Sequence, residues 1–198
     1  MPPQDQSTAV MATYGRFPVK LERGQGVWVH DSQGRRYLDC VAGIATCTLG
    51  HSDRALRRAL TQQLRKLQHV SNLYAIGEQE QLASWIADNS CCDKVFFCNS
   101  GAEANEAAIK LARKYGHSRR GINQPLILTA RSSFHGRTLA AVTATGQPKY
   151  HRGFEPLPEG FAYFDYPVIP SLGAALRQHS ARAVAVLLEP LQGEGGFL

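Results

Sequence analysis

The hydrophobic positions follow two different periods along the first part of the chain. Residues 17–40 alternate β-branched or aromatic positions with polar ones and are interrupted by glycines and the turn DSQG, which predicts an antiparallel meander. Residues 53–67 instead place leucines three and four positions apart, which predicts an amphipathic helix. A second helix is predicted over residues 79–89. Its inward-facing side is expected to hold Leu82, Trp85 and Ile86.

A different pattern begins near the middle of the chain. Three short apolar runs follow one another without polar alternation: KVFFC at 94–98, PLILTA at 125–130 and RAVAVLLEP at 182–190. The segments between them contain predicted helices. Unalternated apolar runs separated by helices are typical of parallel strands that are buried on both faces. This part of the chain therefore predicts an α/β domain with a mostly parallel sheet.

The composition indicates a globular protein and argues against membrane and nucleic-acid partners. The chain has 198 residues, 43% of them hydrophobic and 19% charged, which is typical of a globular protein. No secretory signal and no run of ~20 apolar residues is visible, so we expect a cytoplasmic protein with no membrane partner. The five cysteines lack metal-ligand spacing and are expected to be reduced. The net charge of +6 comes from scattered basic pairs, which favours an anionic small ligand over nucleic acid.

The helix predicted after KVFFC carries the first candidate site. Ser100 and Glu103 have the spacing of a capping box, and Gly116 has the position of a left-handed C-cap. Gly101 and Ala102 leave the amides of the first turn sterically open. Because a helix amino terminus beyond the carboxyl end of a strand attracts anions, these residues predict a phosphate site. A plain structural helix would show the same capping residues.

Two later loops carry further candidates. After the second apolar run, Phe134 and His135 precede a glycine and offer a ring on which a planar ligand can stack. Arg137 can hold a carboxylate through two parallel hydrogen bonds. A core phenylalanine and a surface arginine are the structural alternatives. After the third run, Glu189 and Glu194 are spaced too irregularly for one helix face and suit positioning or gating better than paired acid/base chemistry.

Three motifs in this order resemble the class III aminotransferases, which are fold type I pyridoxal phosphate enzymes: NSGAEANEAAIKLAR, SFHGRTLAAVTATGQPKY and EPLQGEGG. The resemblance continues upstream through GQGVWVHDSQGRRYLDCVAGIATCTLGH and is greatest to the branch that acts on N-acetylornithine. It implies an N-terminal segment with the meander at 1–50. It also implies that 51–198 are the first, incomplete part of the large α/β domain, mostly a parallel sheet, that binds pyridoxal phosphate.

The resemblance also implies roles for the candidate residues. The cofactor phosphate would lie against the backbone of a bare helix start, an aromatic ring would stack on the pyridine with a histidine beside it, and an arginine would take the substrate carboxylate. These residues are Ser100, Gly101 and Ala102 for the phosphate, Phe134 and His135 for the ring, and Arg137 for the carboxylate. Glu194 corresponds to a gating glutamate of the family, and Glu189 to a supporting residue.

The implied activity is transamination between N-acetylornithine and 2-oxoglutarate in arginine biosynthesis, performed by a homodimer. ATCT at 45–48 departs from the common Val-Asn-Ala of the family, near the expected substrate entrance. Ile44 replaces a tyrosine of ornithine-specific relatives, which favours the acetylated substrate. Transamination of succinylornithine, ornithine or 4-aminobutyrate is the alternative within the family. A non-catalytic fragment that only binds pyridoxal phosphate is another.

Transamination with this cofactor needs a Schiff-base lysine and an aspartate on the pyridine nitrogen, and the resemblance places both beyond the third motif. None of the six lysines of the chain stands in a comparable motif. Lys149 lies in a polar, proline-marked loop, without the burial or neighbouring cation that activates a lysine. We therefore expect an N-terminal fragment that is inactive alone and has no catalytic residue of its own.

Overall fold

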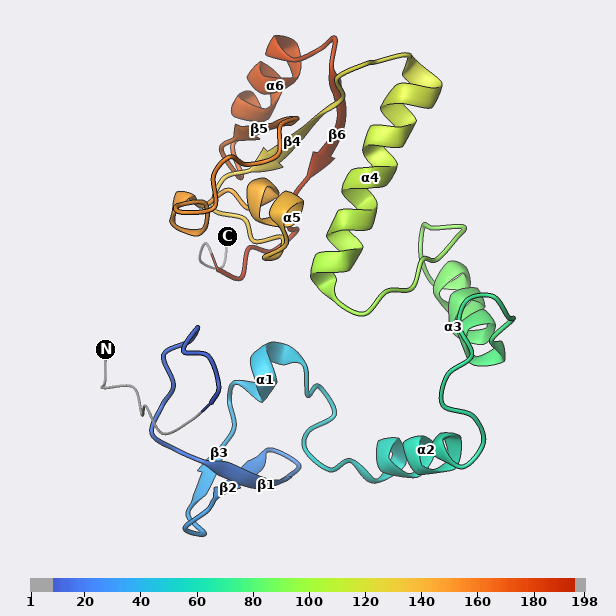
Figure 1. Ribbon diagram of the computed structural model, residues 1–198, viewed down its shortest axis with the longest axis vertical. Helices are drawn as coiled ribbons and strands as arrows, with labels where there is room; N and C mark the ends of the chain where they lie inside the picture. The colour runs from blue at the N-terminus through green and yellow to red at the C-terminus, as the bar shows by residue number, and fades with distance from the viewer. Residues whose placement is uncertain (1–8, 195–198) are drawn as a thin grey trace. The chain divides into compact units, whose positions relative to one another are not determined.

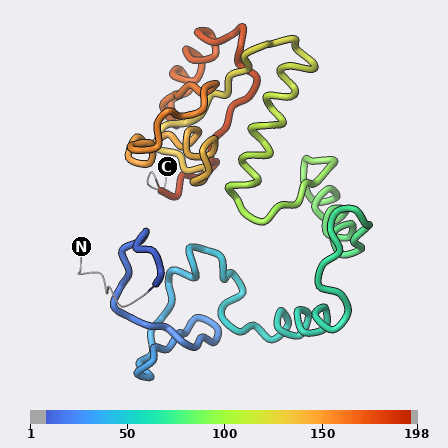
Figure 2. Tube along the Cα trace, viewed as in Figure 1, coloured from blue at the N-terminus to red at the C-terminus, as the bar shows by residue number. Residues whose placement is uncertain are grey.

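The computed structural model describes residues 9–194, and the chain divides into two compact units, Met1–Glu80 and Gln81–Leu198. Figure 1 labels the helices and strands of each unit, and Figure 2 follows the path of the backbone through them. The boundary between the units falls inside helix α3 (Gly77–Asp88). The domain boundary expected at residue 50 stays a prediction. No helix within the described residues is both long and apolar enough to cross a membrane.

The first unit contains the predicted meander. Its strands are β1 (Leu21–Gln25), β2 (Trp28–Asp31) and β3 (Arg36–Leu38), which pair antiparallel in that order. The turn after β2 closes on the buried carboxylate of Asp31, which accepts bonds from Arg35 Nε at 2.7 Å and the Tyr37 hydroxyl at 2.9 Å. Burial by itself raises the pKa of Asp31, but these bonds outweigh burial and lower the pKa to about 2.

A left-handed turn follows the meander. In α1 (Ala42–Ala45) all four residues have positive φ, including 58° at Ile44, a conformation that costs energy for residues other than glycine. Asp39 braces this turn, because its carboxylate accepts the Ala42 amide at 2.9 Å and lies 2.7 Å from Nε2 of His51. The bond to His51 is the largest of the effects that lower the pKa of Asp39.

Two helices complete this stretch of the chain. α2 (Arg54–Leu64) begins at Asp53, whose carboxylate accepts the Leu56 amide at 2.8 Å, so the predicted helix is confirmed. α3 confirms the second predicted helix. The inward positions expected in α3 are wrong for Leu82 and Trp85, which are exposed, while Ile86 is half-buried. None of the residues of α2 or α3 is buried. The described residues leave the apolar faces of both helices uncovered.

The second unit is a layered α/β structure. Its strands are β4 (Leu126–Ala130), β5 (Phe161–Phe164) and β6 (Ala183–Leu187). Its remaining helices are α4 (Gly101–Arg120), α5 (Leu139–Ala144), α6 (Ile169–Gln178) and the 3-10 helix η1 (Pro148–Tyr150). The strands pair in parallel in the order β5-β4-β6, so the predicted parallel strands at 125–130 and 182–190 are confirmed.

The central strand β4 separates two hydrophobic cores. Leu128 and its alternate neighbours pack with Phe164 of β5 and Ala175 of α6. Ile127 points to the other side and packs with Ile109 of α4 and Ala144 of α5. The sheet therefore lies between α6 on one face and α4 with α5 on the other, as can be followed in Figure 1.

Two strand predictions for this unit were wrong or incomplete. KVFFC at 94–98 forms no strand, and Phe96 within it is 72% exposed. A strand needs a neighbour for its amides and carbonyls, and the described residues supply none to this run. β5 was not predicted, because its sequence FAYF is only four residues long and follows a proline-marked loop.

The predicted C-cap at Gly116 was also wrong. α4 continues through this position and ends at Arg120, with Gly121 as the left-handed C-cap at φ 63°. Gly116 serves close packing instead. A Cβ at this position would lie 2.8 Å from Cγ1 of Val184 in β6 and 2.9 Å from Pro125. The glycine therefore allows α4 to approach the sheet.

Candidate cofactor site

The start of α4 is fixed by two of its own side chains. Ser100 is the N-cap, and its hydroxyl accepts the Glu103 amide at 3.2 Å. The Glu103 carboxylate reaches back and accepts the amide of Asn99 at 2.6 Å, one residue before the expected cap amide. The capping box is therefore present in a shifted form. It leaves Gly101 and Ala102, the first two helical residues, with amides that have no intrahelical acceptor.

The space beside Gly101 is open. A Cβ built on Gly101 would meet no atom within 4 Å. The positive end of the helix dipole lies at the same place, since α4 is 20 residues long and begins here. Unpaired amides at a helix start can bond a phosphate or a carboxylate.

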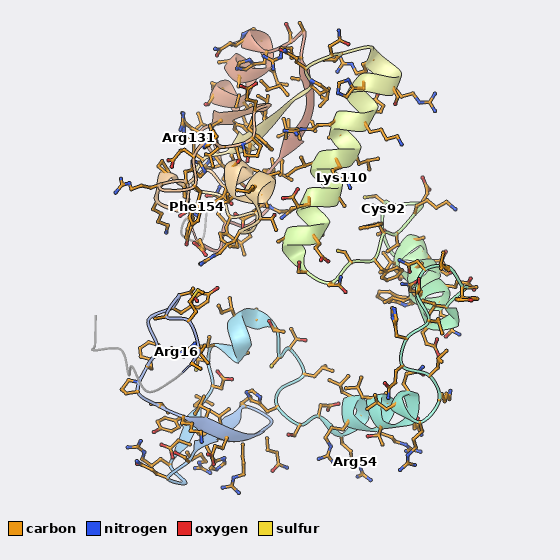
Figure 3. The ribbon with its side chains drawn as sticks, in the orientation of Figure 1. Arg16, Arg54, Cys92, Lys110, Arg131 and Phe154 are labelled. Atoms are coloured by element: carbon orange, nitrogen blue, oxygen red, sulfur yellow. The ribbon has the colours of Figure 1, made fainter. Side chains whose placement is uncertain are left out.

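The loop after β4 packs directly onto this helix start. Gly136 has φ 129°, and a Cβ at this position would lie 2.8 Å from Cβ of Ala102. Only glycine permits both this backbone conformation and this approach. The open amides of α4 and the predicted aromatic loop are therefore neighbours. The side chains of this unit are drawn in Figure 3, where Arg131 marks the carboxyl end of β4.

Two polar side chains of α4 hold the same loop. Asn105 Nδ2 donates to the carbonyl of His135 at 2.7 Å. Glu106 Oε1 accepts the hydroxyl of Thr138 at 2.5 Å and the amide of Ala141 at 3.1 Å, which caps α5. Sequence reasoning missed both residues. The available indication was a pair of polar residues on a helix segment otherwise rich in alanine.

Phe134 is held from the neighbouring strand. Its amide donates to Glu189 Oε2 at 2.9 Å, and its ring is half-buried. Phe134 follows β4 and Glu189 follows β6, which are adjacent in the sheet. A carboxylate at the end of one strand thus fixes the loop at the end of the other. This agrees with the supporting position expected for Glu189, whose role stays a prediction.

His135 is a buried and unsatisfied side chain. It is 4% exposed, its amide donates to Oγ1 of Thr145 at 2.9 Å, and its Nε2 has no hydrogen-bond partner among the described residues. Burial lowers the pKa of His135 to about 4, so the imidazole is neutral at pH 7. Buried polar atoms in folded proteins are nearly always bonded, so an unpaired ring nitrogen is a group that a ligand can satisfy.

The remaining candidates meet at Tyr150. The guanidinium carbon of Arg137 lies 5.3 Å from the centroid of the Tyr150 ring, and the Tyr150 hydroxyl donates to Glu194 Oε2 at 2.6 Å. Lys149 Nζ lies 3.9 Å from the same oxygen, with a side chain that is 62% exposed. Its neighbour is a carboxylate, the opposite of the burial or cation that activates a lysine. Sequence reasoning did not single out Tyr150.

Apart from Glu189, the seven candidate residues form two groups, both in the second unit. The helix start and the loop carrying Phe134 and His135 form one group, joined by the packing of Gly136 on Ala102. The second group is formed around Tyr150 by Arg137 and Glu194. Among the described residues, no cluster of three or more histidine, cysteine or acidic side chains could hold a metal.

These residues fit pyridoxal phosphate, the cofactor that the sequence motifs imply. Open amides at Gly101 and Ala102 suit its phosphate. The half-buried ring of Phe134 suits an aromatic plane, and the unpaired nitrogen of His135 suits a polar ring substituent. The arrangement can therefore bind a planar anion and, beside it, a carboxylate at Arg137.

Comparison with known proteins agrees with this fit. The family model described as aminotransferase class-III matches residues 9–198. The chain is 68% identical over 197 residues to the acetylornithine aminotransferase of Parasynechococcus marenigrum strain WH8102, a match that covers 98% of this chain and 47% of that protein. The chain thus spans about half the length of the curated relatives it matches.

Two solved structures have the same fold. The ornithine aminotransferase from Toxoplasma gondii ME49 matches with a TM-score of 0.89 at 29% identity, over 96% of this chain and 45% of that one. The N-acetylornithine aminotransferase from Stenotrophomonas maltophilia K279a matches with a TM-score of 0.76 at 41% identity, over 93% and 44% respectively. The expected α/β fold of type I is confirmed by these likenesses.

Proposed function

The chain belongs to the class-III aminotransferase family, whose members depend on pyridoxal phosphate, and we propose that it binds this cofactor for amino-group exchange between N-acetylornithine and 2-oxoglutarate. That exchange is a step of arginine biosynthesis. The 68% identity to an acetylornithine aminotransferase supports this substrate, as does Ile44. We further propose that the enzyme is a cytoplasmic homodimer.

One observation carries the proposal. The packing of Gly136 on Ala102 puts two open helix amides next to the loop that bears Phe134 and His135. In the proposed arrangement the amides of Gly101 and Ala102, with Ser100 nearby, hold the phosphate. The ring of Phe134 stacks on the pyridine, and His135 donates or accepts one bond as a neutral imidazole. Bound pyridoxal phosphate supplies the electron sink for amino-group transfer.

Substrate recognition is assigned to the second group of residues. Arg137 presents a planar guanidinium that can bind a carboxylate through two parallel bonds. Glu194 supplies a nearby negative charge that would accept a cationic amine and oppose a second carboxylate. Glu189 acts through Phe134, since its carboxylate holds the amide that orients that residue.

We also infer that the 198-residue chain does not transaminate by itself. The reaction needs a lysine that bonds the cofactor and moves a proton. Of the six lysines, Lys149 lies at the site, yet it is exposed and beside a carboxylate. Its surroundings do not activate it for that role.

Titration of the purified chain with pyridoxal phosphate, followed by cofactor absorbance and fluorescence, tests the site. Gly136→Ala would place a Cβ against Ala102, and because overpacking costs about 1–3 kcal/mol, we expect binding about tenfold weaker. Gly153→Ala is the matched control, since Gly153 also has positive φ, 88°, but has no atom within 4 Å of its Cβ position. Equal binding by both variants, or none by the wild type, would contradict the site.

The same samples test the inference about inactivity. Borohydride reduces a bond between the cofactor and a lysine and makes it permanent. We expect mass spectrometry to find no single lysine that carries the cofactor in a 1:1 ratio to the chain after reduction. Such attachment at one lysine, together with transfer of an amino group from N-acetylornithine to 2-oxoglutarate, would contradict the inference.

Ornithine transamination is the second candidate function. It is favoured by the TM-score of 0.89 to the Toxoplasma gondii ornithine aminotransferase, which exceeds the 0.76 to an N-acetylornithine enzyme. Calorimetric titration of the cofactor-loaded chain with N-acetylornithine, ornithine, succinylornithine and 4-aminobutyrate separates the candidates. We expect N-acetylornithine to bind most tightly, and tighter binding of ornithine would reverse the assignment.

A further inference from the structure

Tyr150 contacts side chains from both groups of candidate residues. Its ring centroid lies 5.8 Å from that of Phe134, with the rings inclined by 70° in an edge-to-face pair. The Arg137 guanidinium lies over the same ring at 5.3 Å, and Lys149 Nζ lies over it at 4.7 Å. The hydroxyl donates to Glu194 at 2.6 Å. One side chain thus touches the proposed stacking ring, the proposed carboxylate ligand and the proposed gate.

The backbone that carries Tyr150 is braced on both sides. Its amide donates to the carbonyl of Gln147 at 3.0 Å, and Gln147 Nε2 donates to the carbonyl of Ser133 at 3.0 Å. His151 Nε2 lies 2.9 Å and 2.7 Å from the carbonyls of Val142 and Thr145, so it donates to the carboxyl-terminal end of α5. The ring therefore has a defined position from which to orient its neighbours.

The hydroxyl and the ring of Tyr150 do different things. The hydroxyl of a tyrosine donates to an acceptor that lies near the plane of the ring. Cations contact the face of the ring, and other aromatic rings contact its face or its edge. The hydroxyl therefore keeps the Glu194 carboxylate at the rim of the ring, while Arg137 stays over the face. A bond from a hydroxyl to a carboxylate is among the stronger hydrogen bonds in proteins.

We propose that Tyr150 is a positioning residue that holds Glu194 away from the carboxylate-binding face of Arg137 and orients the Phe134 ring. The contacts of Tyr150 are seen in the structure, but their effect on substrate binding rests on the proposed function. Without the hydroxyl, the Glu194 carboxylate can swing and compete with a substrate carboxylate for the guanidinium. Without the ring, Phe134 and Arg137 also lose their shared neighbour.

Two variants separate these effects. Tyr150→Phe keeps the ring and removes the hydroxyl, and Tyr150→Leu removes both. The probes are pyridoxal phosphate, followed by fluorescence, and glutarate, a dicarboxylate, titrated calorimetrically into the cofactor-loaded chain. Tyr163→Phe is the matched control, because the Tyr163 hydroxyl also makes a 2.6 Å bond, to the carbonyl of Thr143.

Tyr150→Phe is expected to leave cofactor affinity within about twofold and to weaken glutarate binding about five- to tenfold, the range of one net hydrogen bond. Tyr150→Leu is expected to weaken both ligands, and Tyr163→Phe neither. In a Glu194→Gln background, Tyr150→Phe should have no further effect on glutarate. Wild-type glutarate affinity in Tyr150→Phe, or an undiminished effect in the Glu194→Gln background, would overturn the proposal.

A measurement without ligand tests the positioning role of Tyr150 independently of the proposed function. Tyr150→Phe, Glu194→Gln and the double variant form a cycle for urea unfolding of the chain without cofactor. We expect the two substitutions to be non-additive, with the double variant within about twofold of either single variant in its unfolding equilibrium constant. Additive effects would overturn the positioning role. If the wild type binds no pyridoxal phosphate, the proposed function fails and this cycle alone decides on Tyr150.

Discussion

β4 and α2 both have simple apolar patterns in the sequence, but their surroundings differ completely. All five residues of β4 are buried, between β5 and β6 and between the helices on either face. α2 has a good cap at Asp53 and a leucine face, yet none of its residues is buried, and Leu60 is 56% exposed. Local pattern and capping determine that an element forms. What covers it depends on residues elsewhere.

The difference has a consequence for function. The candidate cofactor site lies in the unit in which β4 is fully packed, so its loops start from rigid elements. Asn105, Glu106 and Glu189 then tie those loops to α4 and to the end of β6. A site built in this way can be precise without help from the uncovered leucine face of α2.

A leucine-to-alanine substitution in β4 and in α2 gives the largest expected difference in the free energy of unfolding. Leu128→Ala removes a fully buried side chain of β4 and should lower the free energy of unfolding by about 2–5 kcal/mol, because a cavity remains. Leu60→Ala in α2 removes an exposed side chain and should change it by less than about 0.5 kcal/mol. Urea unfolding monitored by circular dichroism measures both. Similar losses would mean that α2 is covered in solution and that the two elements do not differ in burial.

Acid should also distinguish buried from exposed groups. His135 has a pKa of about 4 in the folded chain, lowered by burial, against about 6.5 when unfolded. Between these values the unfolded chain binds a proton that the folded chain does not. Stability therefore falls as pH drops from about 6.5 to 4 and is fully retained above 6.5, a loss on the order of 2–3 kcal/mol at pH 4.5.

Urea unfolding at pH 7.5 and 4.5 measures this loss. His135→Gln should be less sensitive to pH than the wild type by roughly that amount. His117→Gln, an exposed position on α4 in the same unit, is the control and should keep the wild-type pH dependence. If His135→Gln keeps the full dependence, the buried imidazole is not the group responsible.

Much of the second unit was predictable from local pattern. The apolar runs gave the correct places for β4 and β6, and Ser100 with Glu103 located the start of α4. Each of these depends on residues within a few positions of one another. The candidate residues Phe134 and Arg137 came from motifs of similar length, and the structure places them in the loop expected.

Features that depend on distant residues could not be predicted in this way. The Tyr150 hydroxyl bonds Glu194, 44 positions away, and no local spacing indicates that contact. KVFFC looked like a strand because it is apolar, but pairing depends on a neighbour that the described residues do not supply. Gly116 has the position of a C-cap in the sequence, because a glycine near a helix end is usually one. In the structure Gly116 instead leaves room for Val184 of β6, which packs against α4 at this position.

Gly116 shows the effect of the surroundings of an element at the scale of one methyl group. In a helix interior, alanine is favoured over glycine by about 1 kcal/mol when space allows. At Gly116 the added Cβ would lie 2.8 Å from Val184 and 2.9 Å from Pro125, and overpacking of this kind costs about 1–3 kcal/mol. Gly116→Ala should therefore be destabilising by about 1 kcal/mol in urea unfolding.

The control is Gly173→Ala in α6, where the added Cβ would meet only the flexible end of Arg177, at 3.4 Å. This substitution should stabilise by about 0.5–1 kcal/mol, because the helical preference for alanine is not opposed by a clash. Opposite signs at two helical glycines of the same unit would show that contact with the sheet decides the outcome at Gly116. Stabilisation by both would mean that α4 can move away from β6 at little cost, and the start of α4, where we propose that the cofactor binds, would then be less rigid than its packing indicates.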